Sequence, residues 1–435
     1  MVASAKRPLV LEVVFNSTLV QGSLMFKQIS INNWRQFEHV DLAFHPKLTL
    51  LTGANGAGKT TILNLLNRHF GWNLQFVSTP KKSKKGLLKY ASDFWMHFPK
   101  SPEAEPPPLN DIGSITYQDG DEANLQVPSN VQHAYEVQIT GMKTMPGTFV
   151  PSHRPVFIYQ QVQQIPTRLN AKRQLLDTYL AELRNSYQSG GRRHSASFRI
   201  KEALISLATF GYGNPVVTPD EEAIQTFEGF QSILQIVLPR SLGFKRFAIR
   251  MPEIVLETDT GEFSFDSVSG GIASIMDLAW QIYMCSLVYE SKFTVVMDEP
   301  ENHLHPSLQR EMLPSFLKAF PQIQFIAATH NPFVVSSVPD SHVYVLDYNN
   351  NNKVTSTQLD LVNKAGTSNE ILRSVLGVPV TMPIWVEERI QSIVETYEGS
   401  EVNEKVLMSI REQMKSLGLE KLFPEVVAKV LKDEE

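Results

Sequence analysis

The sequence contains one cysteine, no uninterrupted apolar run long enough to cross a bilayer and no large excess of either charge. The single cysteine, Cys285, excludes a disulfide within the chain and is typical of proteins from a reducing cytoplasm. Its apolar surroundings predict a buried thiol rather than a nucleophile. The net charge of −5 argues against a protein that coats DNA, although basic loops can still contact phosphates. We therefore expect a cytoplasmic protein with no membrane contact.

Sustained heptads and repeats of fixed period are also missing, which excludes a long coiled coil. The 435 residues predict one large α/β domain with a smaller inserted or appended part. We expect an N-terminal extension over residues 1–24 and a core made of residues 25–160 and 260–347. A mainly helical insertion is expected over residues 161–259, and a helical C-terminal region over residues 348–435.

The most informative segment is Gly53–Thr60, because its sequence GANGAGKT matches the phosphate-binding pattern G-x-x-x-x-G-K-[ST]. The apolar run over residues 48–51 predicts the strand that enters this loop, and residues 61–66 predict the helix that leaves it. Backbone N–H groups of such a loop surround phosphates, and the helix N-terminus adds partial positive charge. Lys59 is expected to reach the β- and γ-phosphates, and Thr60 to bind Mg²⁺. The residues expected to contact ATP here are Asn55, Gly56, Gly58, Lys59, Thr60 and Thr61.

Residues 293–300 predict a buried strand that ends in the two carboxylates Asp298 and Glu299. Asp298 is expected to hold Mg²⁺, and Glu299 to act as the base that activates the attacking water. His330 follows another apolar strand and is expected to hydrogen-bond the γ-phosphate. Together these residues predict ATP hydrolysis.

A second anion-binding segment precedes the apolar helix that contains the cysteine. Ser269, Gly270 and Gly271 are expected to present N–H groups at the helix N-terminus. One chain does not need two γ-phosphate sites unless two chains share the nucleotide. The segment therefore predicts a homodimer or higher homo-oligomer that assembles on ATP.

In this order the motifs resemble the Walker A, signature, Walker B and switch-histidine elements of ABC-type ATPases. Asn33-Trp34-Arg35 and Asp298–Pro306 are similar to segments of the soluble branch that includes RecF, SMC and OLD-type proteins. The resemblance covers residues 25–75 and 260–345. It implies an α/β P-loop head with a mixed sheet, an antiparallel β subdomain, a helical insertion and a helical C-terminal tail. It also implies that Arg35 contacts the nucleotide.

The resemblance further implies a glutamine that contacts the metal ion between the core and the insertion. Residues 156–159 predict a strand, and several glutamines follow it, of which Gln161 is favoured. Ser152–Arg154 is an alternative nucleotide-facing segment. The signature segment, Val268–Ile272, lacks an acidic residue or glutamine at its end, and Asn331 stands where serine is common; both departures are compatible with slow turnover.

OLD-type proteins add a metal-dependent nuclease that needs a Glu and an Asp-x-Asp pair. The sequence after His330 has no Asp-x-Asp, so no nuclease activity is expected from this chain. Residues 369–378 are similar to tails of stand-alone ATPases in bacterial anti-phage systems such as Septu. That similarity implies a separate effector, such as a nuclease. Amphipathic helices between Ile384 and Leu431 are expected to dock this partner or another subunit, or to pack on the core.

Two basic loops support a different function. These loops could contact DNA phosphates, as in a RecF-like ATPase of DNA repair. The residues concerned are Lys81–Lys85 and Arg192–His194, together with Arg199. Basic runs are more often solvated loops. A third hypothesis is a slow, nucleotide-gated scaffold, which the altered signature segment favours.

Overall fold

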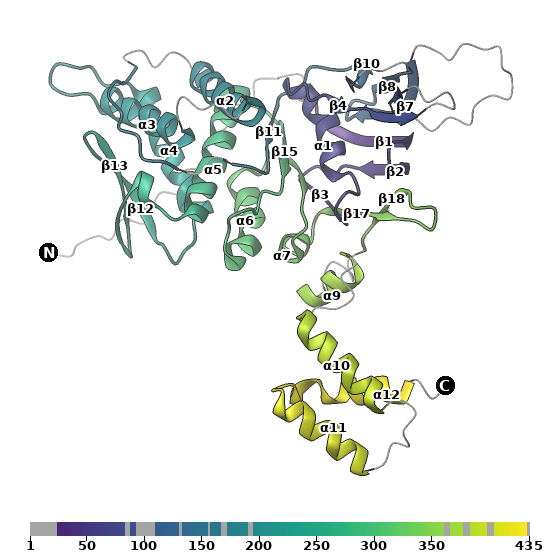
Figure 1. The fold of residues 1–435 in the computed structure, drawn as a ribbon. Coiled ribbons are helices and arrows are strands. Elements are labelled where there is room, and N and C mark those ends of the chain that lie inside the picture. Colours follow the sequence, from purple (N-terminus) through teal and green to yellow (C-terminus); the bar gives the residue numbers. More distant parts are fainter. Residues whose placement is uncertain are drawn as a thin grey trace, which may run out of the picture. The chain divides into compact units, whose positions relative to one another are not determined.

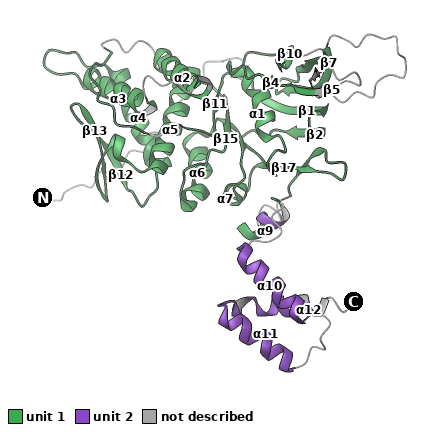
Figure 2. Cartoon of the chain, in the orientation of Figure 1, with its two compact units in different colours: residues 1–371, 375–377 green, residues 372–374, 378–435 purple. Residues whose placement is uncertain are grey.

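The computed structural model describes residues 24–82, 88–92, 109–129, 133–154, 157–166, 172–189, 195–360, 366–376, 383–397 and 404–432. The chain divides into two compact units, one formed by residues 1–371 and 375–377, the other by residues 372–374 and 378–435 (Figure 2). The predicted extension over residues 1–24 lies, except for Leu24, outside the described residues.

The first unit is built on an eleven-stranded mixed sheet with the order β10-β8-β7-β1-β2-β18-β17-β3-β16-β15-β11 (Figure 1). Its strands are β1 (Phe26–Trp34), β2 (Phe37–Ala43), β3 (Leu48–Gly53), β7 (Leu109–Tyr117), β8 (Glu122–Pro128), β10 (Gln138–Thr140), β11 (Gly147–Val150), β15 (Thr294–Asp298), β16 (Gln324–Ala328), β17 (His342–Tyr348) and β18 (Val354–Gln358). The strands from β17 to β11 run parallel, whereas β10, β8, β7, β1 and β2 form an antiparallel meander.

The central parallel strands are buried along their whole length, which explains their continuous apolar sequences. Asp298 pairs with Ala328 and Ala328 pairs with Leu51, so the carboxyl ends of β15, β16 and β3 lie at one edge. This register brings the residues that follow the three strands close together. The predicted fold class, an α/β head with a mixed sheet, is confirmed.

Helices cover the parallel strands and form a separate lobe at the β11 edge of the sheet (Figure 1). The helices of this unit are α1 (Lys59–Asn67), α2 (Lys172–Ser189), α3 (Ala196–Tyr212), α4 (Glu221–Val237), α5 (Gly270–Tyr289), α6 (Pro306–Ala319) and α7 (Pro332–Val335), with short 3₁₀ turns η1 (Arg68–Phe70) and η2 (Phe265–Ser267). Residues 368–371 of α9 (Ser368–Ser374) also belong to it. Two small ribbons pair β4 (Phe76–Val77) with β9 (Ala134–Tyr135) and β5 (Thr79–Lys82) with β6 (Leu88–Ala91).

Helix α5 is the central helix of this unit and packs against α2, α4 and β11. Within the described chain it alone is long and apolar enough to cross a membrane, but 78% of its most apolar stretch is buried inside the protein. Cys285 lies on α5 and is fully buried, and burial raises the pKa of its thiol to about 12. The prediction of a core thiol is confirmed.

The insertion predicted over residues 161–259 is mainly helical, with α2, α3 and α4, and it also contains two strands, β12 (Phe244–Arg250) and β13 (Glu253–Thr258). These strands form a sheet with β14 (Gly261–Ser264) beside α4. Two predictions about the chain's organisation need correction. The strand expected at 156–159 is absent from its described part, Phe157–Tyr159, and the strand of that region is β11. The C-terminal unit begins near residue 378 rather than 348, since β18 belongs to the main sheet.

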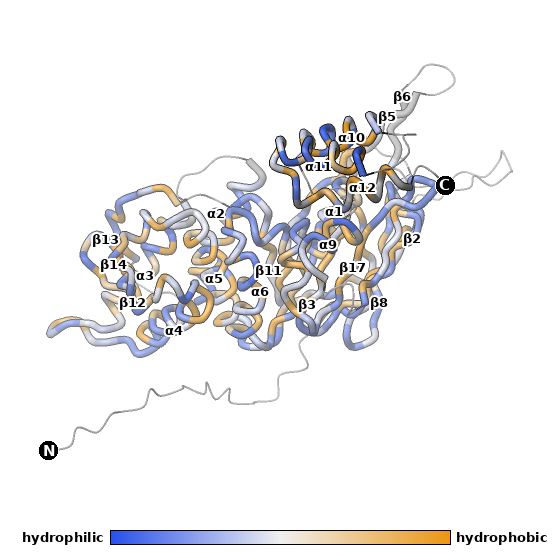
Figure 3. Tube along the Cα trace, turned by 90° about the horizontal axis from the view of Figure 1, so that it is seen from below, coloured by the Kyte–Doolittle hydropathy of each residue, from blue (hydrophilic) through white to orange (hydrophobic). Residues whose placement is uncertain are grey.

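The second unit consists of α10 (Ile384–Tyr397), α11 (Glu404–Ser416), η3 (Glu420–Leu422) and α12 (Phe423–Lys432). Polar and apolar residues alternate along these helices (Figure 3). Their apolar faces enclose a small core of their own, made of Val386, Ile390, Ile393, Val394, Ile410, Met414, Leu419, Val426 and Val430. The predicted amphipathic helices are therefore present and bury one face among themselves.

Candidate nucleotide-binding site

At two positions of the loop between β3 and α1, the backbone conformation and the neighbouring atoms leave room only for glycine. Gly53 has φ +124°, and a Cβ there would lie 2.1 Å from the carbonyl oxygen of Leu346. Gly58 has φ +95°, and a Cβ there would lie 2.4 Å from the side chains of Gln36 and Phe37. The glycines of the motif thus allow the loop to pack tightly against its neighbours while it opens toward solvent at Asn55 and Gly56.

Lys59, the first residue of α1, is buried, and its ammonium group donates to the carbonyl oxygens of Gly53 and Ala54 at 3.0 Å each. Burial lowers the pKa of Lys59 to about 8, against the opposing effect of Asp298 and Glu299. The cation is therefore held across the mouth of the loop, where an anion would compensate its desolvation.

Thr60 and Asp298 face each other, as the predicted Mg²⁺ site requires. The Thr60 hydroxyl donates to Asp298 Oδ2 at 3.1 Å. Burial raises the pKa of Asp298 to about 6, and the neighbouring Glu299 contributes to the rise. A hydroxyl and a carboxylate oxygen are ligands that Mg²⁺ prefers, and the perturbed carboxyl is one that a cation would stabilise, so this pair fits the ion.

Glu299 is held by contacts on both sides. Its backbone has φ +46°, and its N–H donates to the carbonyl oxygen of Ala328 at 2.9 Å. Asn302 Nδ2 donates to Glu299 Oε2 at 2.9 Å, and His330 Nε2 lies 3.8 Å from Oε1. Burial, followed by the charge of Lys59, lowers the pKa of His330, which keeps the imidazole neutral at neutral pH. The carboxylate therefore has a fixed position with its second oxygen facing the histidine.

The turn between β1 and β2 lies beside the phosphate loop. Gln36 Nε2 donates to the carbonyl oxygen of Gly56 at 3.4 Å. Arg35, next to it, has φ +53°, and its guanidinium lies 5.7 Å from the ring centre of Phe76. The structure thus places Arg35 next to the loop, and its contact with the nucleotide stays a prediction.

The signature segment lies at the N-terminus of α5. Ser269 and Gly270 are exposed there, and a Cβ on Gly271 would lie 3.3 Å from the carbonyl oxygen of His303. Helix α5 packs on β11, which is three strands from β3, a separation of about 14 Å at ordinary strand spacing. The helix that carries the segment therefore packs on a different part of the sheet from the phosphate loop, and Ser269 and Gly270 are open to another molecule.

The chain is similar to several known proteins. A family model described as an AAA domain matches residues 28–105, and one described as "AAA domain, putative AbiEii toxin, Type IV TA system" matches residues 188–336. The Septu protein PtuA of Bacillus thuringiensis is 23% identical over 380 residues, which cover 84% of this chain and 87% of that protein. A probable ATPase of retron Ec83 from Escherichia coli is 24% identical over 395 residues, which cover 75% of this chain and 72% of that protein. The chain thus resembles ABC-type ATPases of bacterial defence. Among solved structures, the SMC head domain from Thermotoga maritima is similar at 14% identity and a TM-score of 0.39, over 77% of this chain and 99% of that one.

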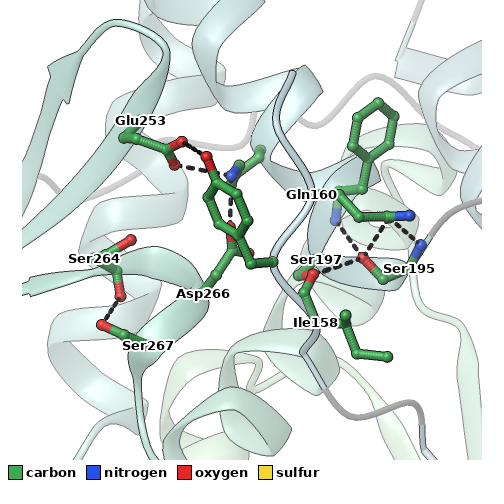
Figure 4. A network of polar contacts seen from close by, with 11 residues as sticks. Ile158, Gln160, Ser195, Ser197, Glu253, Ser264, Asp266 and Ser267 are labelled. Atoms are coloured by element: carbon green, nitrogen blue, oxygen red, sulfur yellow. Dashed lines mark hydrogen bonds and ion pairs between the residues drawn. The ribbon is translucent and has the colours of Figure 1, made fainter. Parts of the chain in front are cut away.

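The segment after β11 lies beside Asp298, whereas Gln161 lies farther along the chain. Val150 pairs with Met297, so residues just beyond β11 lie beside Asp298, and the charge of His153 acts on the pKa of that carboxyl. Gln161 is exposed eleven residues beyond Val150, and the adjacent Gln160 accepts hydrogen bonds from the Ser195 backbone and hydroxyl (Figure 4). The structure therefore favours the alternative segment, Ser152–Arg154, over Gln161.

Arg154 of this segment points into the protein rather than toward the phosphate loop. It is buried and donates to the carbonyl oxygens of Pro300, of Asn302 at 3.4 Å and of Ser274 at 3.2 Å. One guanidinium thus connects the segment after β11, the loop after β15 and helix α5. This contact was not predicted from the sequence.

Glu301, a buried carboxyl in the same loop, gives a testable pH dependence. Thr329 donates its hydroxyl to Glu301, and burial raises the pKa of Glu301 from 4.5 to about 7. The folded state therefore binds a proton more tightly than the unfolded state, so stability falls as the pH rises from about 4.5 to about 7, by on the order of 3 kcal/mol from this group.

Glu301→Gln should remove this loss, because an amide can accept the same hydrogen bond without ionising. The measurement is the free energy of unfolding by urea between pH 4.5 and 7.5. The surface variant Glu311→Gln, at an exposed position of α6, should keep the wild-type profile. Identical profiles for Glu301→Gln and wild type would contradict the assignment of a neutral carboxyl.

The basic residues considered for DNA contact lie partly outside the described residues. Ser83–Lys85 and Arg192–His194 lie outside the described residues. Arg199 is paired with Glu182 at 3.0 Å and Glu202 at 2.9 Å. Its charge is therefore already engaged by two carboxylates.

Proposed function

We propose that this protein hydrolyses ATP at a site completed by a second copy of the chain and thereby controls a separate effector in anti-phage defence. The observation that carries the proposal is the convergence of Lys59, Thr60, Asp298, Glu299 and His330 at the carboxyl ends of adjacent parallel strands. The exposed signature segment, on a helix that packs on β11, supports the shared site.

Each residue has a chemical role in this proposal. The buried ammonium of Lys59 neutralises charge on the terminal phosphates, and Glu299 accepts the proton of the attacking water. Asn302 keeps the Glu299 carboxylate in place. Neutral His330 donates to the γ-phosphate from the other side of that carboxylate. Mg²⁺, held by Thr60 and Asp298, supplies charge neutralisation of the phosphates.

The second copy contributes Ser269, Gly270 and Gly271. These residues begin a helix of 20 residues, and its first N–H groups are the free donors that bind a γ-phosphate. ATP between two chains would then act as the contact that joins them. ADP lacks the γ-phosphate that the second chain would bind, so hydrolysis would release the two chains.

The effector is proposed to dock on the C-terminal unit. Exposed apolar side chains there include Ile384 (73%), Trp385 (56%) and Met408 (60%). Such residues on an amphipathic helix are typical of protein contact surfaces. The similarity to Septu and retron proteins supports an effector encoded by a separate gene, and a nuclease is the class proposed.

The proposal is tested by comparing the isolated chain with the chain co-expressed with products of its flanking genes. Phosphate release from ATP should be present in the isolated chain, and cleavage of plasmid DNA with Mg²⁺ should require the second protein. Removal of residues 378–435 should abolish co-purification while the remaining unit still hydrolyses ATP. Plasmid cleavage by the isolated chain, lost in Glu299→Gln, would contradict the separate effector.

A further inference from the structure

Tyr348 is an exposed aromatic side chain at the phosphate loop that the roles above do not use. It ends β17, and 42% of its surface is exposed. A Cβ built on Gly56 would lie 3.5 Å from the Tyr348 hydroxyl oxygen. The tyrosine therefore stands directly beside the open part of the loop.

Two turns hold Tyr348 in this place. The turn that follows it is joined to the β1–β2 turn, because Asn349 Nδ2 donates to Glu38 and the Val354 backbone N–H donates to the Gln36 carbonyl oxygen at 2.8 Å. Gln36 in turn bonds to Gly56. The loop, the β1–β2 turn and the β17–β18 turn thus form one connected surface.

Sheet order assigns the two sides of the loop to different parts of a nucleotide. β3 lies between β16 and β17. The groups suited to the terminal phosphate lie at the carboxyl ends of β15 and β16. They are Asp298, Glu299 and His330. A nucleotide whose γ-phosphate is directed to that side extends its nucleoside toward the opposite side, where β17 ends. Tyr348 and Arg35 are the flat side chains found there.

We propose that Tyr348 binds the base of the nucleotide by stacking, and that the connected turns form the nucleoside end of the site. The inference rests on the proposed ATPase function. An aromatic face stacks on any base, so this contact strengthens binding of ATP and GTP alike. It adds nothing to the binding of a phosphate chain that lacks a nucleoside.

The test compares the affinities of ATP, GTP and inorganic tripolyphosphate, each with Mg²⁺, by calorimetry on the full chain. Tyr348→Ala should weaken ATP and GTP about tenfold or more, Tyr348→Phe should bind them like wild type, and tripolyphosphate should bind all three proteins equally. Tyr212→Ala is the matched control, since Tyr212 is 49% exposed and bonds to Glu228 in the helical lobe.

Unchanged ATP affinity in Tyr348→Ala would overturn the inference, because the base would then lie elsewhere. Equal losses for ATP and tripolyphosphate would also overturn it, since Tyr348 would be acting through the shape of the phosphate loop. If the wild-type protein binds none of ATP, GTP and tripolyphosphate, the nucleotide site itself is contradicted, and the inference with it.

Discussion

Glu299→Gln should lower the rate of ATP hydrolysis by about 10²–10⁴-fold while ATP remains bound. The amide keeps the size of the side chain and can still meet Asn302, which donates to Glu299 Oε2 at 2.9 Å. It cannot accept the proton of the attacking water. Because bound ATP then persists, the protein should also accumulate in its ATP-joined form.

The measurement is phosphate release at saturating ATP, together with mass in solution with and without Mg-ATP. Glu311→Gln makes the same chemical change at an exposed position of α6 and should behave like wild type in both. Hydrolysis by Glu299→Gln at the wild-type rate would show that another group activates water. A protein with low turnover in both wild type and variant would instead support the slow scaffold.

Lys201→Met should destabilise the helical lobe by about 3–5 kcal/mol. The Lys201 side chain is completely buried and its ammonium lies 2.9 Å from Glu253 and 2.5 Å from Asp266. Figure 4 shows the two carboxylates approaching from β13 and from the turn before α5. Removal of the lysine leaves the buried carboxylate of Asp266 and the partly buried carboxylate of Glu253 without their cation.

Lys245→Met is a matched control, because Lys245 pairs with Asp259 at 2.8 Å on the surface, where the side chains are 59% and 69% exposed. That change should cost less than about 1 kcal/mol. Urea unfolding of the three proteins gives the comparison. Equal small losses in both variants would show that the buried cluster is not a stabilising ion pair. Because Asp266 stands two residues before the signature segment, Lys201→Met should also weaken ATP-dependent assembly.

The phosphate loop and the acidic strand end could be predicted because the information is local. Strands β3 and β15 are mostly apolar, and the glycines and carboxylates lie at their carboxyl ends or directly after them in the sequence. Their meeting in space follows from the rule that parallel strands present their carboxyl ends at one edge. The sequence also predicts that the signature segment acts on another chain, because one chain does not need two γ-phosphate sites.

Other parts of the site depend on contacts that no local pattern reveals. The sequence predicted a strand at residues 156–159 instead of β11, because β11, Gly147–Val150, is less apolar than the residues near Phe157. Phe157 is buried without forming a strand. The prediction of Gln161 as a metal contact rested on that misplaced strand, and it stays a prediction. Lys201 is 52 residues from Glu253 and 65 from Asp266, so its ion pairs follow from tertiary packing alone.

Complementation between two inactive variants tests the shared active site most directly. Lys59→Ala removes the phosphate-binding cation, and Ser269→Arg blocks the signature segment that is proposed to act on the other chain. Each variant alone should be inactive. An equal mixture should recover about a quarter of wild-type hydrolysis, because half of the randomly formed pairs contain one intact site of two. An active Ser269→Arg protein, or a mixture that stays inactive although both variants are folded, would contradict a nucleotide site built from two chains.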